Sequence, residues 1–230
     1  MDHSHKEEHL ASSAFITDIV IGMSDGLTVP FALAAGLSGT VHNNNIITTA
    51  GIAEIVAGSI AMGLGGYLAG KTEQEHYQSE LRREYDEVEN LPEKEKQEVR
   101  DVFAEYGLSK HTQDIIAEEM SKDKDKWVDF MMRYELGLEK PHTNRARNSA
   151  ATIGMSYIVG GFIPLSAYFF THTPYEGLIG SAFLTVICLF VFGYLKSKVT
   201  GQPPVMGALK VTLIGIAAAA AAFIIAKSFN

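Results

Sequence analysis

Apolar residues gather in five long runs along the chain, each long enough to cross a lipid bilayer as a helix. A bilayer core needs about 20 consecutive, mostly apolar residues in helical form. The five runs cover residues 15–39, 46–70, 150–170, 177–195 and 207–226. Buried helices of a large soluble protein are the alternative, but five such runs in 230 residues leave too little polar sequence to cover them. The pattern therefore predicts an all-α, polytopic membrane protein with five transmembrane helices.

The distribution of lysine and arginine orients these spans. The loops at 40–45 and 171–176 contain neither residue. Basic residues flank the opposite ends of the spans: Lys6, Lys71, Arg145, Arg147, Lys196 and Lys198. Because cytosolic loops carry an excess of Lys and Arg, we expect the N-terminus, with a flexible polar segment at 1–14, to face the cytosol. The number of spans is odd, so the C-terminus is expected in the opposite compartment.

A charged block separates the second and third spans. Between Thr72 and His142 lie 20 of the 27 Asp and Glu residues of the chain. Such an acidic surface argues against a nucleic-acid partner, which needs a basic footprint, and it suits cations. The block divides the membrane-spanning sequence into a segment at 15–71 and a segment at 145–230.

Three helices are expected in the insert at 72–144. The helix of the second span meets no proline until Pro92, so it continues into the insert. A second helix opens at Pro92 and closes at Gly107, and a third ends before Pro141 with a break near residues 121–126. The insert is therefore predicted to be a small cytosolic three-helix domain.

Ionisable side chains occur inside the predicted spans, where they are costly and usually face a cavity or a partner. Asp18 and Asp25 are seven residues apart, hence on one face of the first helix, and Glu54 lies in the second span. Pro30, five residues after Asp25, removes a backbone donor and so frees carbonyl oxygen near that carboxylate. These oxygens are candidates for the lining of a cation path.

Each of these residues also has a purely structural interpretation. A carboxylate can fix helix packing through a hydrogen bond, and Asp18 lies near enough to the membrane interface to be hydrated. Met62, eight residues after Glu54, sits among small residues that let helices pack closely, and it could simply fill space there. Beside carboxylates, however, its thioether is a soft ligand suited to a transition metal.

Carboxylates in the insert lie on helical faces. Glu84 and Glu87 are three residues apart on the first insert helix, as are Glu95 and Glu98 on the second. Glu84 falls within an apolar stripe, and Glu95 lies one turn before another. The stripes consist of Tyr77, Leu81 and Val88 on the first helix and of Val99, Phe103 and Tyr106 on the second. Acids aimed at a helix interface repel one another unless a cation or protons join them.

The third insert helix adds Met131, Met132 and Glu135, and Met131 and Glu135 are four residues apart. A site rich in oxygen that also contains sulfur fits Fe²⁺, Mn²⁺ or Co²⁺ better than Mg²⁺ or Ca²⁺. The alternative is a solvated acidic helix with core methionines. A di-iron oxidase needs two Glu-x-x-His motifs, and the insert has a single copy, Glu73 to His76, so we discount an oxidase.

Three features together resemble the vacuolar iron transporter family. They are "SDGLTVPFALAAG" in the first span, "AEIVAGSIAMGLGGYLA" in the second, and the acidic helical insert. The resemblance covers residues 15–227. It implies a homodimeric Fe²⁺/H⁺ antiporter rather than an enzyme. Such a protein lies in the vacuolar membrane and moves iron from the cytosol into the vacuole, so the C-terminus would be lumenal.

The resemblance also implies roles for individual residues. The path would run between the first helices of the two protomers, with Asp25 and Met62 as ligands and Glu54 assisting transport or proton coupling. Asp18 joins these candidates through its position on the face of Asp25. The insert would hold metal through Glu84, Glu87, Glu95, Glu98, Met131, Met132 and Glu135.

We therefore predict a proton-coupled transporter of Fe²⁺, with Mn²⁺ and other divalent transition metals as further candidate ions. The expected partners are a second copy of the chain, membrane lipid, metal ions and protons. Two alternatives stay open: a metal-sensing membrane protein that transports nothing and a passive divalent-metal channel. A membrane-anchored ferroxidase is a third rival, against which the single Glu-x-x-His motif argues.

Overall fold

The structure is a computed structural model that describes residues 8–228, and this range contains helices and their connections but no strand. The chain divides into two compact units. The membrane unit consists of the residues up to Leu68 and those from Ala146 onward, and the insert unit is Ala69–Arg145. The all-α class is confirmed. His3 and His5, in the N-terminal segment predicted to be flexible, lie outside the described residues.

Five of the described helices are long and apolar enough to cross a membrane, which confirms the number of predicted spans. They are α1 Glu8–Ser38, α2 Asn44–Asn90, α6 Arg145–Phe169, α7 Pro174–Val199 and α8 Pro204–Ser228. The helix of α1 begins before the end of the segment 1–14 and continues through Pro30. The helix of α2 runs without interruption from the second span into the insert, as the absence of proline before Pro92 predicts.

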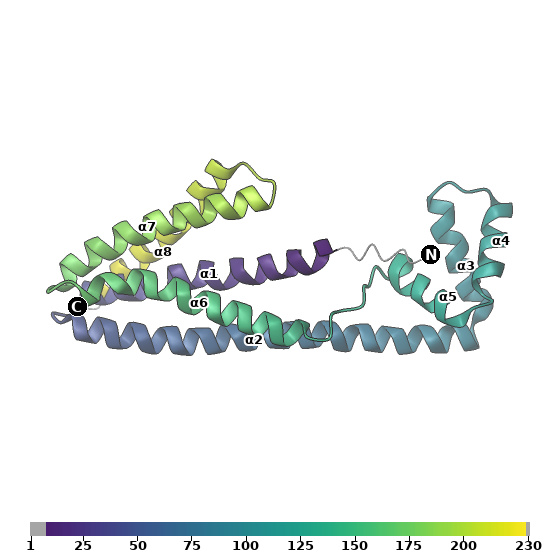
Figure 1. The fold of residues 1–230 in the computed structure, drawn as a ribbon, viewed down its shortest axis with the longest axis horizontal. Helices are drawn as coiled ribbons and strands as arrows, with labels where there is room; N and C mark the ends of the chain where they lie inside the picture. The colour runs from purple at the N-terminus through teal and green to yellow at the C-terminus, as the bar shows by residue number, and fades with distance from the viewer. Residues whose placement is uncertain (1–7, 229–230) are drawn as a thin grey trace. The chain divides into compact units, whose positions relative to one another are not determined.

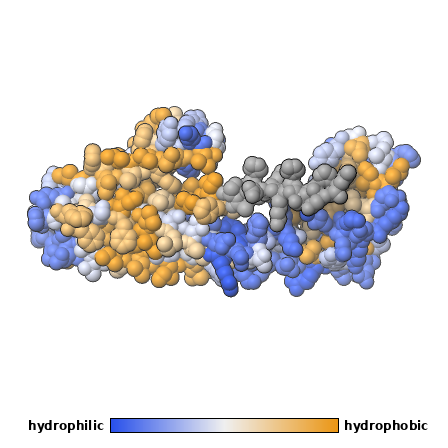
Figure 2. Space-filling view, in the orientation of Figure 1, coloured by the Kyte–Doolittle hydropathy of each residue, from blue (hydrophilic) through white to orange (hydrophobic). Residues whose placement is uncertain are grey.

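Apolar side chains cover much of the outer surface of the membrane unit. On α2, Ile52, Val56, Ile60 and Leu64 follow one another every four residues, and all four are exposed. Figure 2 shows hydrophobic residues gathered over the helices of this unit. Exposed apolar surface of this extent is a liability in water but suits contact with lipid. The surface therefore agrees with five membrane-spanning helices.

Glycines let α6 pack closely against α1 and α2 in the membrane unit (Figure 1). On α1, a Cβ added to Gly22 or Gly26 would clash with the carbonyl oxygen of Ile153 or Tyr157 in α6. On α2, a Cβ added to Gly58 would lie 2.5 Å from the Tyr157 ring. Small residues at this spacing allow transmembrane helices to approach one another. Tyr157 is thus one of the residues at which α6 meets both neighbours.

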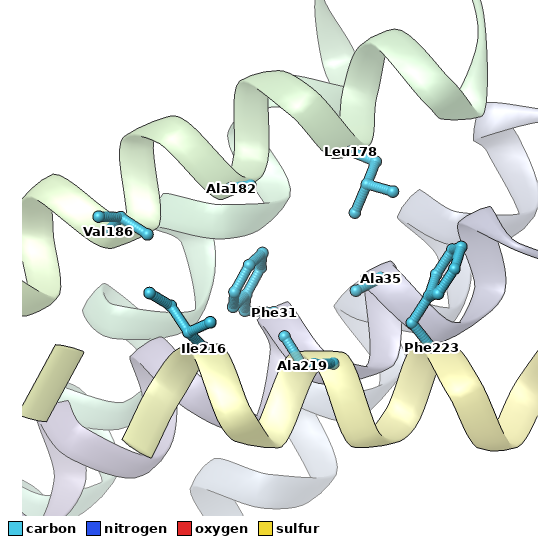
Figure 3. Close-up of a pocket in the computed structure, with 9 residues that line it drawn as sticks. Phe31, Ala35, Leu178, Ala182, Val186, Ile216, Ala219 and Phe223 are labelled. Carbon is cyan, nitrogen blue, oxygen red and sulfur yellow. The ribbon is translucent and has the colours of Figure 1, made fainter. Parts of the chain in front are cut away.

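A second set of contacts joins α7 and α8 to α1. A Cβ added to Gly193 of α7 would lie 2.9 Å from the Ala208 Cα of α8, so these two helices also approach closely. The three helices enclose an apolar groove of about 420 Å³ (Figure 3). Its lining includes Phe31, Ala35, Leu178, Ala182, Val186, Ile216, Ala219 and Phe223.

The insert unit is built from the end of α2 and four shorter helical segments. They are α3 Pro92–Glu105, α4 Lys110–Met120, α5 Lys124–Phe130 and a π-helical turn, η1, Met131–Glu135. Pro92 occupies the first turn of α3, where its missing N–H is tolerated. The side chains of Ser109 and Asp123 cap α4 and α5 by accepting hydrogen bonds from the backbone N–H groups of Thr112 and Lys126.

The third predicted helix of the insert is broken where the sequence predicts a break, and its last helical turn ends several residues before Pro141. The break predicted near residues 121–126 is confirmed, because α4 ends at Met120 and α5 begins at Lys124. The helical segment then stops at Glu135, well before Pro141. The reason is local: Gly137 has a φ of 63°, a left-handed conformation that glycine adopts at little cost. The unit therefore has more helical segments than the three predicted.

The apolar stripes predicted on the first two insert helices form much of the core of this unit, with one exception. Val88 and Val99 are buried there together with Trp127, the single tryptophan of the sequence. The assignment of Tyr106 to the stripe is wrong, because this residue is 72% exposed. Since α3 ends at Glu105, Tyr106 already lies in the turn and no longer shares the buried face of the helix.

Candidate functional site

Three glutamates from three different helical segments meet in the insert unit. Glu84 lies on α2, Glu95 on α3 and Glu135 in η1. Each offers one carboxylate oxygen, and these three oxygens lie within 4.8 Å of one another. Glu84 reaches the interior because it sits one turn before the buried Val88 on the apolar stripe of α2. We call these three residues the glutamate cluster.

Two members of the glutamate cluster are almost completely removed from solvent. Glu84 and Glu95 are 1% and 0% exposed, whereas Glu135 is exposed. Among the described residues, neither Glu84 Oε2 nor Glu95 Oε2 has a hydrogen-bond partner. A buried carboxylate oxygen without a partner is costly when it carries charge. The cluster is therefore incomplete without protons or a cation.

Two cationic side chains partly neutralise the glutamate cluster. The Lys94 ammonium lies 2.9 Å from Glu98 Oε1 and 3.5 Å from Glu95 Oε1. From α2, the Arg83 guanidinium lies 3.8 Å from Glu84 Oε1. Both cations are about half exposed, so water weakens their attraction for the carboxylates. Each buried glutamate thus has one oxygen facing a cation and one oxygen left over.

Burial and like charge raise the pKa values of these carboxyl groups. Burial raises the pKa of Glu84 to about 7, and repulsion from Glu135 and Glu87 acts in the same direction. Burial raises the pKa of Glu95 to about 7 as well, with a further contribution from Glu98. Although Glu135 is exposed, its pKa is also raised, first by partial desolvation of the carboxyl group and then by Glu98. Near neutral pH, a metal ion entering the cluster would therefore have to displace protons.

The remaining predicted ligands of the insert lie around the glutamate cluster. Glu87 and Glu98 are partly exposed and close enough to raise the pKa values of its members. Met131 and Met132 are both 0% exposed and belong to the apolar core of the unit. They open η1, the same turn that ends in Glu135. π-Helical turns are rare and frequently occur at functional sites.

The donor set of the glutamate cluster suits a divalent transition metal. A cation between the three carboxylates would remove their mutual repulsion and give the two unpartnered oxygens a partner. The carboxylates provide hard oxygen ligands, and the methionines of η1 bring soft sulfur into the same unit. Borderline ions such as Fe²⁺ accept both kinds of ligand.

Asp25 is half-buried in the membrane unit, next to the contact between α1 and α6. Its neighbour Gly26 packs against the backbone of Tyr157. Because Pro30 has no N–H, the Gly26 carbonyl lacks the donor that the residue four positions later normally supplies in a helix. The Asp25 carboxylate and the Gly26 carbonyl are therefore two successive acceptors on α1.

Glu54 is held from α6 by a hydrogen bond. The Tyr157 hydroxyl donates to Glu54 Oε1. The other oxygen, Glu54 Oε2, is buried and has no hydrogen-bond partner in the part of the chain that the structure describes. One turn along α2, the absence of a side chain at Gly58 leaves room for the Tyr157 ring. Tyr157 thus orients Glu54 and leaves one carboxylate oxygen available.

The other two path candidates occupy different environments. Asp18 is only 4% exposed, which contradicts its interpretation as a hydrated residue at the interface. Met62 is half-buried on α2, two turns beyond Glu54. Of the four candidates, Asp25 and Glu54 are thus the pair that the contacts of Tyr157 bring together, Asp25 through its neighbour Gly26.

The apolar groove between α1, α7 and α8 offers nothing to a cation. Its side chains are all Ala, Val, Leu, Ile or Phe (Figure 3). A dehydrated cation needs oxygen, nitrogen or sulfur ligands. The carboxylates described above, and not this groove, are therefore the candidates for ion binding in the membrane unit.

Three functional candidates are not singled out by the sequence alone. Tyr157 lies in an apolar run, and the only signal for it is that a buried tyrosine hydroxyl usually finds a partner. Arg83 and Lys94 are two of 11 basic residues between Thr72 and His142, and their spacing does not reveal which of these cations reach buried glutamates.

The chain matches the model of the VIT family over residues 16–227. It is 48% identical over 224 residues to vacuolar iron transporter 1 of Tulipa gesneriana, covering 97% of this chain and 91% of that protein. Vacuolar iron transporter 1 of Arabidopsis thaliana is also 48% identical, over 227 residues that cover 99% of this chain and 90% of that protein. Protein CCC1 of Saccharomyces cerevisiae is 38% identical over 219 residues, 91% of this chain and 68% of that protein. The plant relatives are named as transporters and not as enzymes, and the match to the family over nearly the whole chain means that this protein belongs to the VIT family.

Proposed function

We propose that this protein moves Fe²⁺ from the cytosol into the vacuole in exchange for protons. The observation that carries the proposal is the 48% identity, over nearly the whole chain, to two plant proteins named vacuolar iron transporters. Carboxylates with unpartnered oxygens in both units support it, because a transported cation needs such ligands. Mn²⁺ and other divalent transition metals are further candidate ions, since the same ligands accept them.

In this proposal the insert unit faces the cytosol and collects the ion. The glutamate cluster binds it through the oxygens that have no hydrogen-bond partner, and Glu87 and Glu98 add negative charge at the edge. Met131 and Met132 supply sulfur from the start of η1. Because the pKa values of Glu84 and Glu95 are about 7, binding of the metal releases protons to the cytosol.

The path through the membrane uses the carboxylates of α1 and α2. Asp25 and Met62 hold the passing ion, Asp18 lies on the face of Asp25, and Glu54 is held in place by Tyr157. In a homodimer, the first helices of both protomers line this path. Protons from an acidic lumen compete for the same carboxylates, so one carboxylate exchanges a metal ion for a proton. The positive-inside distribution of Lys and Arg supports a cytosolic N-terminus and a lumenal C-terminus.

Metal uptake into proteoliposomes, with and without an acidic interior, tests this function. We expect Fe²⁺ to accumulate against its own gradient only when the interior is acidic, because proton exit then drives metal entry. Uptake that follows the metal gradient and ignores the pH gradient would indicate a passive channel. No uptake under either condition would indicate a sensor and would contradict the proposal. Consumption of oxygen together with Fe²⁺ would identify a ferroxidase.

Removal of the Lys94 ammonium is expected to tighten metal binding. The Lys94→Gln variant loses the cation that competes with metal for Glu95 and Glu98. Because Lys94 is 54% exposed and water weakens its attraction for the carboxylates, we expect a gain of no more than roughly fivefold in affinity. Calorimetric titration of the full chain in detergent with Mn²⁺ measures this change. The control is Lys122→Gln, which removes an exposed ion pair with Glu119. A weaker Mn²⁺ affinity in Lys94→Gln than in this control would mean that Lys94 supports the cluster and does not compete.

A further inference from the structure

A basic cavity lies in the insert unit and shares no residue with the glutamate cluster. It has a volume of about 380 Å³ and is formed by α2 and by the segment between η1 and α6. Lys71 and Arg82 line it from α2, and Lys140 lines it from the segment. Glu75 is the only acidic residue in its lining. Three cationic side chains therefore surround one space in a unit that is acidic as a whole.

Two of these cations differ from most other basic residues of the insert unit because they form no ion pair with a carboxylate among the described residues. Among the described residues, all but three Lys and Arg side chains of Ala69–Arg145 form an ion pair with a carboxylate. The three exceptions are Arg82, Lys110 and Lys140, and two of them line the basic cavity. Lys71 is paired with Glu75 at 3.7 Å, but both side chains are exposed, so this pair is weak. The cavity thus concentrates cationic charge that the chain itself leaves without a counter-charge.

The wall opposite α2 is held in place by hydrogen bonds. The side-chain amide of Gln74 donates to the backbone carbonyls of His142 at 2.9 Å and Thr143 at 3.1 Å. Tyr77, only 8% exposed, anchors the same part of α2 in the core of the unit. The basic cavity is therefore preformed, as binding sites for small molecules usually are.

The position of Lys71 along α2 indicates what kind of molecule could enter. Lys71 directly follows Gly70, at the end of the apolar run of the second span. Lipid phosphates lie just outside the hydrocarbon core, and basic residues immediately beyond a membrane helix attract anionic lipids. Arg82 lies a further 11 residues, or about 16 Å, along the helix. A ligand that contacts both Lys71 and Arg82 therefore lies at the membrane surface and extends away from it, and it carries phosphate.

We propose that the basic cavity binds a phosphate-bearing anion. Arg82 offers the planar, bidentate donors that match phosphate oxygens, and Lys71 and Lys140 add point charges. The phosphorylated headgroup of a cytosolic-leaflet lipid and free inorganic phosphate provide the same chemistry, and the place of Lys71 at the end of the span favours the lipid. Binding joins α2 to the segment that leads into α6 and offsets the repulsion between an acidic domain and an anionic membrane surface.

Titration of the full chain in detergent with two probes tests the proposal. The probes are a short-chain phosphatidylinositol bisphosphate and inorganic phosphate, and binding is followed by calorimetry. We expect the double variant Arg82→Gln/Lys140→Gln to bind the lipid probe about thirtyfold more weakly than the wild type, since each cation near a membrane surface contributes roughly fivefold. Lys110→Gln is the matched control, because it removes the one unpaired cation of the described insert that does not line the cavity.

The outcomes separate the sources of phosphate. Binding of the lipid probe alone, lost in the double variant and kept in Lys110→Gln, supports a lipid headgroup. Equal binding of both probes with the same dependence on Arg82 and Lys140 supports free phosphate. Binding of neither probe, or equal loss in the double variant and in Lys110→Gln, would overturn the proposal. None of these results depends on metal transport.

Discussion

Replacement of Asp25 with asparagine is expected to reduce Fe²⁺ uptake into proteoliposomes with an acidic interior to the level of protein-free vesicles. Asparagine has nearly the same shape as aspartate, so the packing of Gly26 against α6 is kept. The substitution removes a negative charge inside the membrane unit, where a divalent ion has little other compensation. The loss corresponds to roughly 3 kcal/mol or more, a factor of about a hundred in rate. The measurement is the initial uptake rate per reconstituted protein.

The Tyr157→Phe variant is compared with Asp25→Asn in the same uptake assay. It keeps the ring that packs against Gly58 but loses the hydrogen bond to Glu54. We expect a smaller fall in the uptake rate, about fivefold, because one hydrogen bond contributes about 1 kcal/mol. An uptake rate in Asp25→Asn equal to that of the wild type would remove Asp25 from the path. A larger fall in Tyr157→Phe than in Asp25→Asn would show that the architecture around Tyr157, and not the Asp25 charge, limits transport.

The second large effect is expected from Glu95→Gln in the insert unit, which should weaken metal binding and yet stabilise the metal-free protein at alkaline pH. Glu95 is 0% exposed, and its pKa of about 7 lies well above the ordinary value of 4.5. Glutamine resembles the protonated carboxyl group in shape and charge. The variant therefore removes a metal ligand together with the cost of ionising a buried group.

The free energy of unfolding of the wild type should decrease as pH rises. A carboxyl group whose pKa is raised on folding binds protons more tightly in the folded state, so the free energy of unfolding falls as pH rises from about 4.5 to about 7. At pH 4 Glu95 of the wild type is protonated in the folded state and largely protonated in the unfolded state, so the wild type should nearly match the variant. At pH 8 the variant should be more stable, by roughly 3 kcal/mol at most, because the pKa of Glu95 is raised from 4.5 to about 7.

Trp127 provides the measurement. It is the single tryptophan of the chain and lies in the core of the insert unit, so its fluorescence in a denaturant titration follows the unfolding of this unit. Mn²⁺ affinity is measured on the same samples by calorimetry. The control is Glu93→Gln on the same helix, whose carboxylate is 80% exposed and should affect neither quantity. Equal unfolding midpoints for Glu95→Gln and the wild type at pH 8, or unchanged Mn²⁺ affinity, would contradict the role of the cluster.

The sequence predicts those parts of this protein that depend on local periodicity. Five apolar runs predict the five helices that can cross a membrane. The spacing of Glu84 within an apolar stripe predicts its burial, and a run of charged residues predicts the break between α4 and α5. In each case the pattern acts within a few turns of one helix, where 3.6 residues per turn fix which side chains share a face.

Contacts between distant residues could not be predicted in this way. Glu54 and Tyr157 are 103 residues apart, and only the packing of α6 against α2 brings them together. The meeting of Glu135 with Glu84 depends on the π-helical turn η1, which no simple periodicity reveals. The exposure of Tyr106 shows the same limit, because a helix that ends two residues earlier than expected changes which residues are buried.

The close approach of α1 and α6 restricts how the membrane unit can change shape. Gly22 and Gly26 bring the two main chains into direct contact, so sliding one helix by a residue would drive a side chain into the backbone of the other. The two helices must therefore move as one rigid body that carries Asp25 with it. If Asp25 holds the passing ion as proposed, its exposure first to one side of the membrane and then to the other would arise from rearrangement of the helices around this body, and not from bending of the segment that holds the carboxylate.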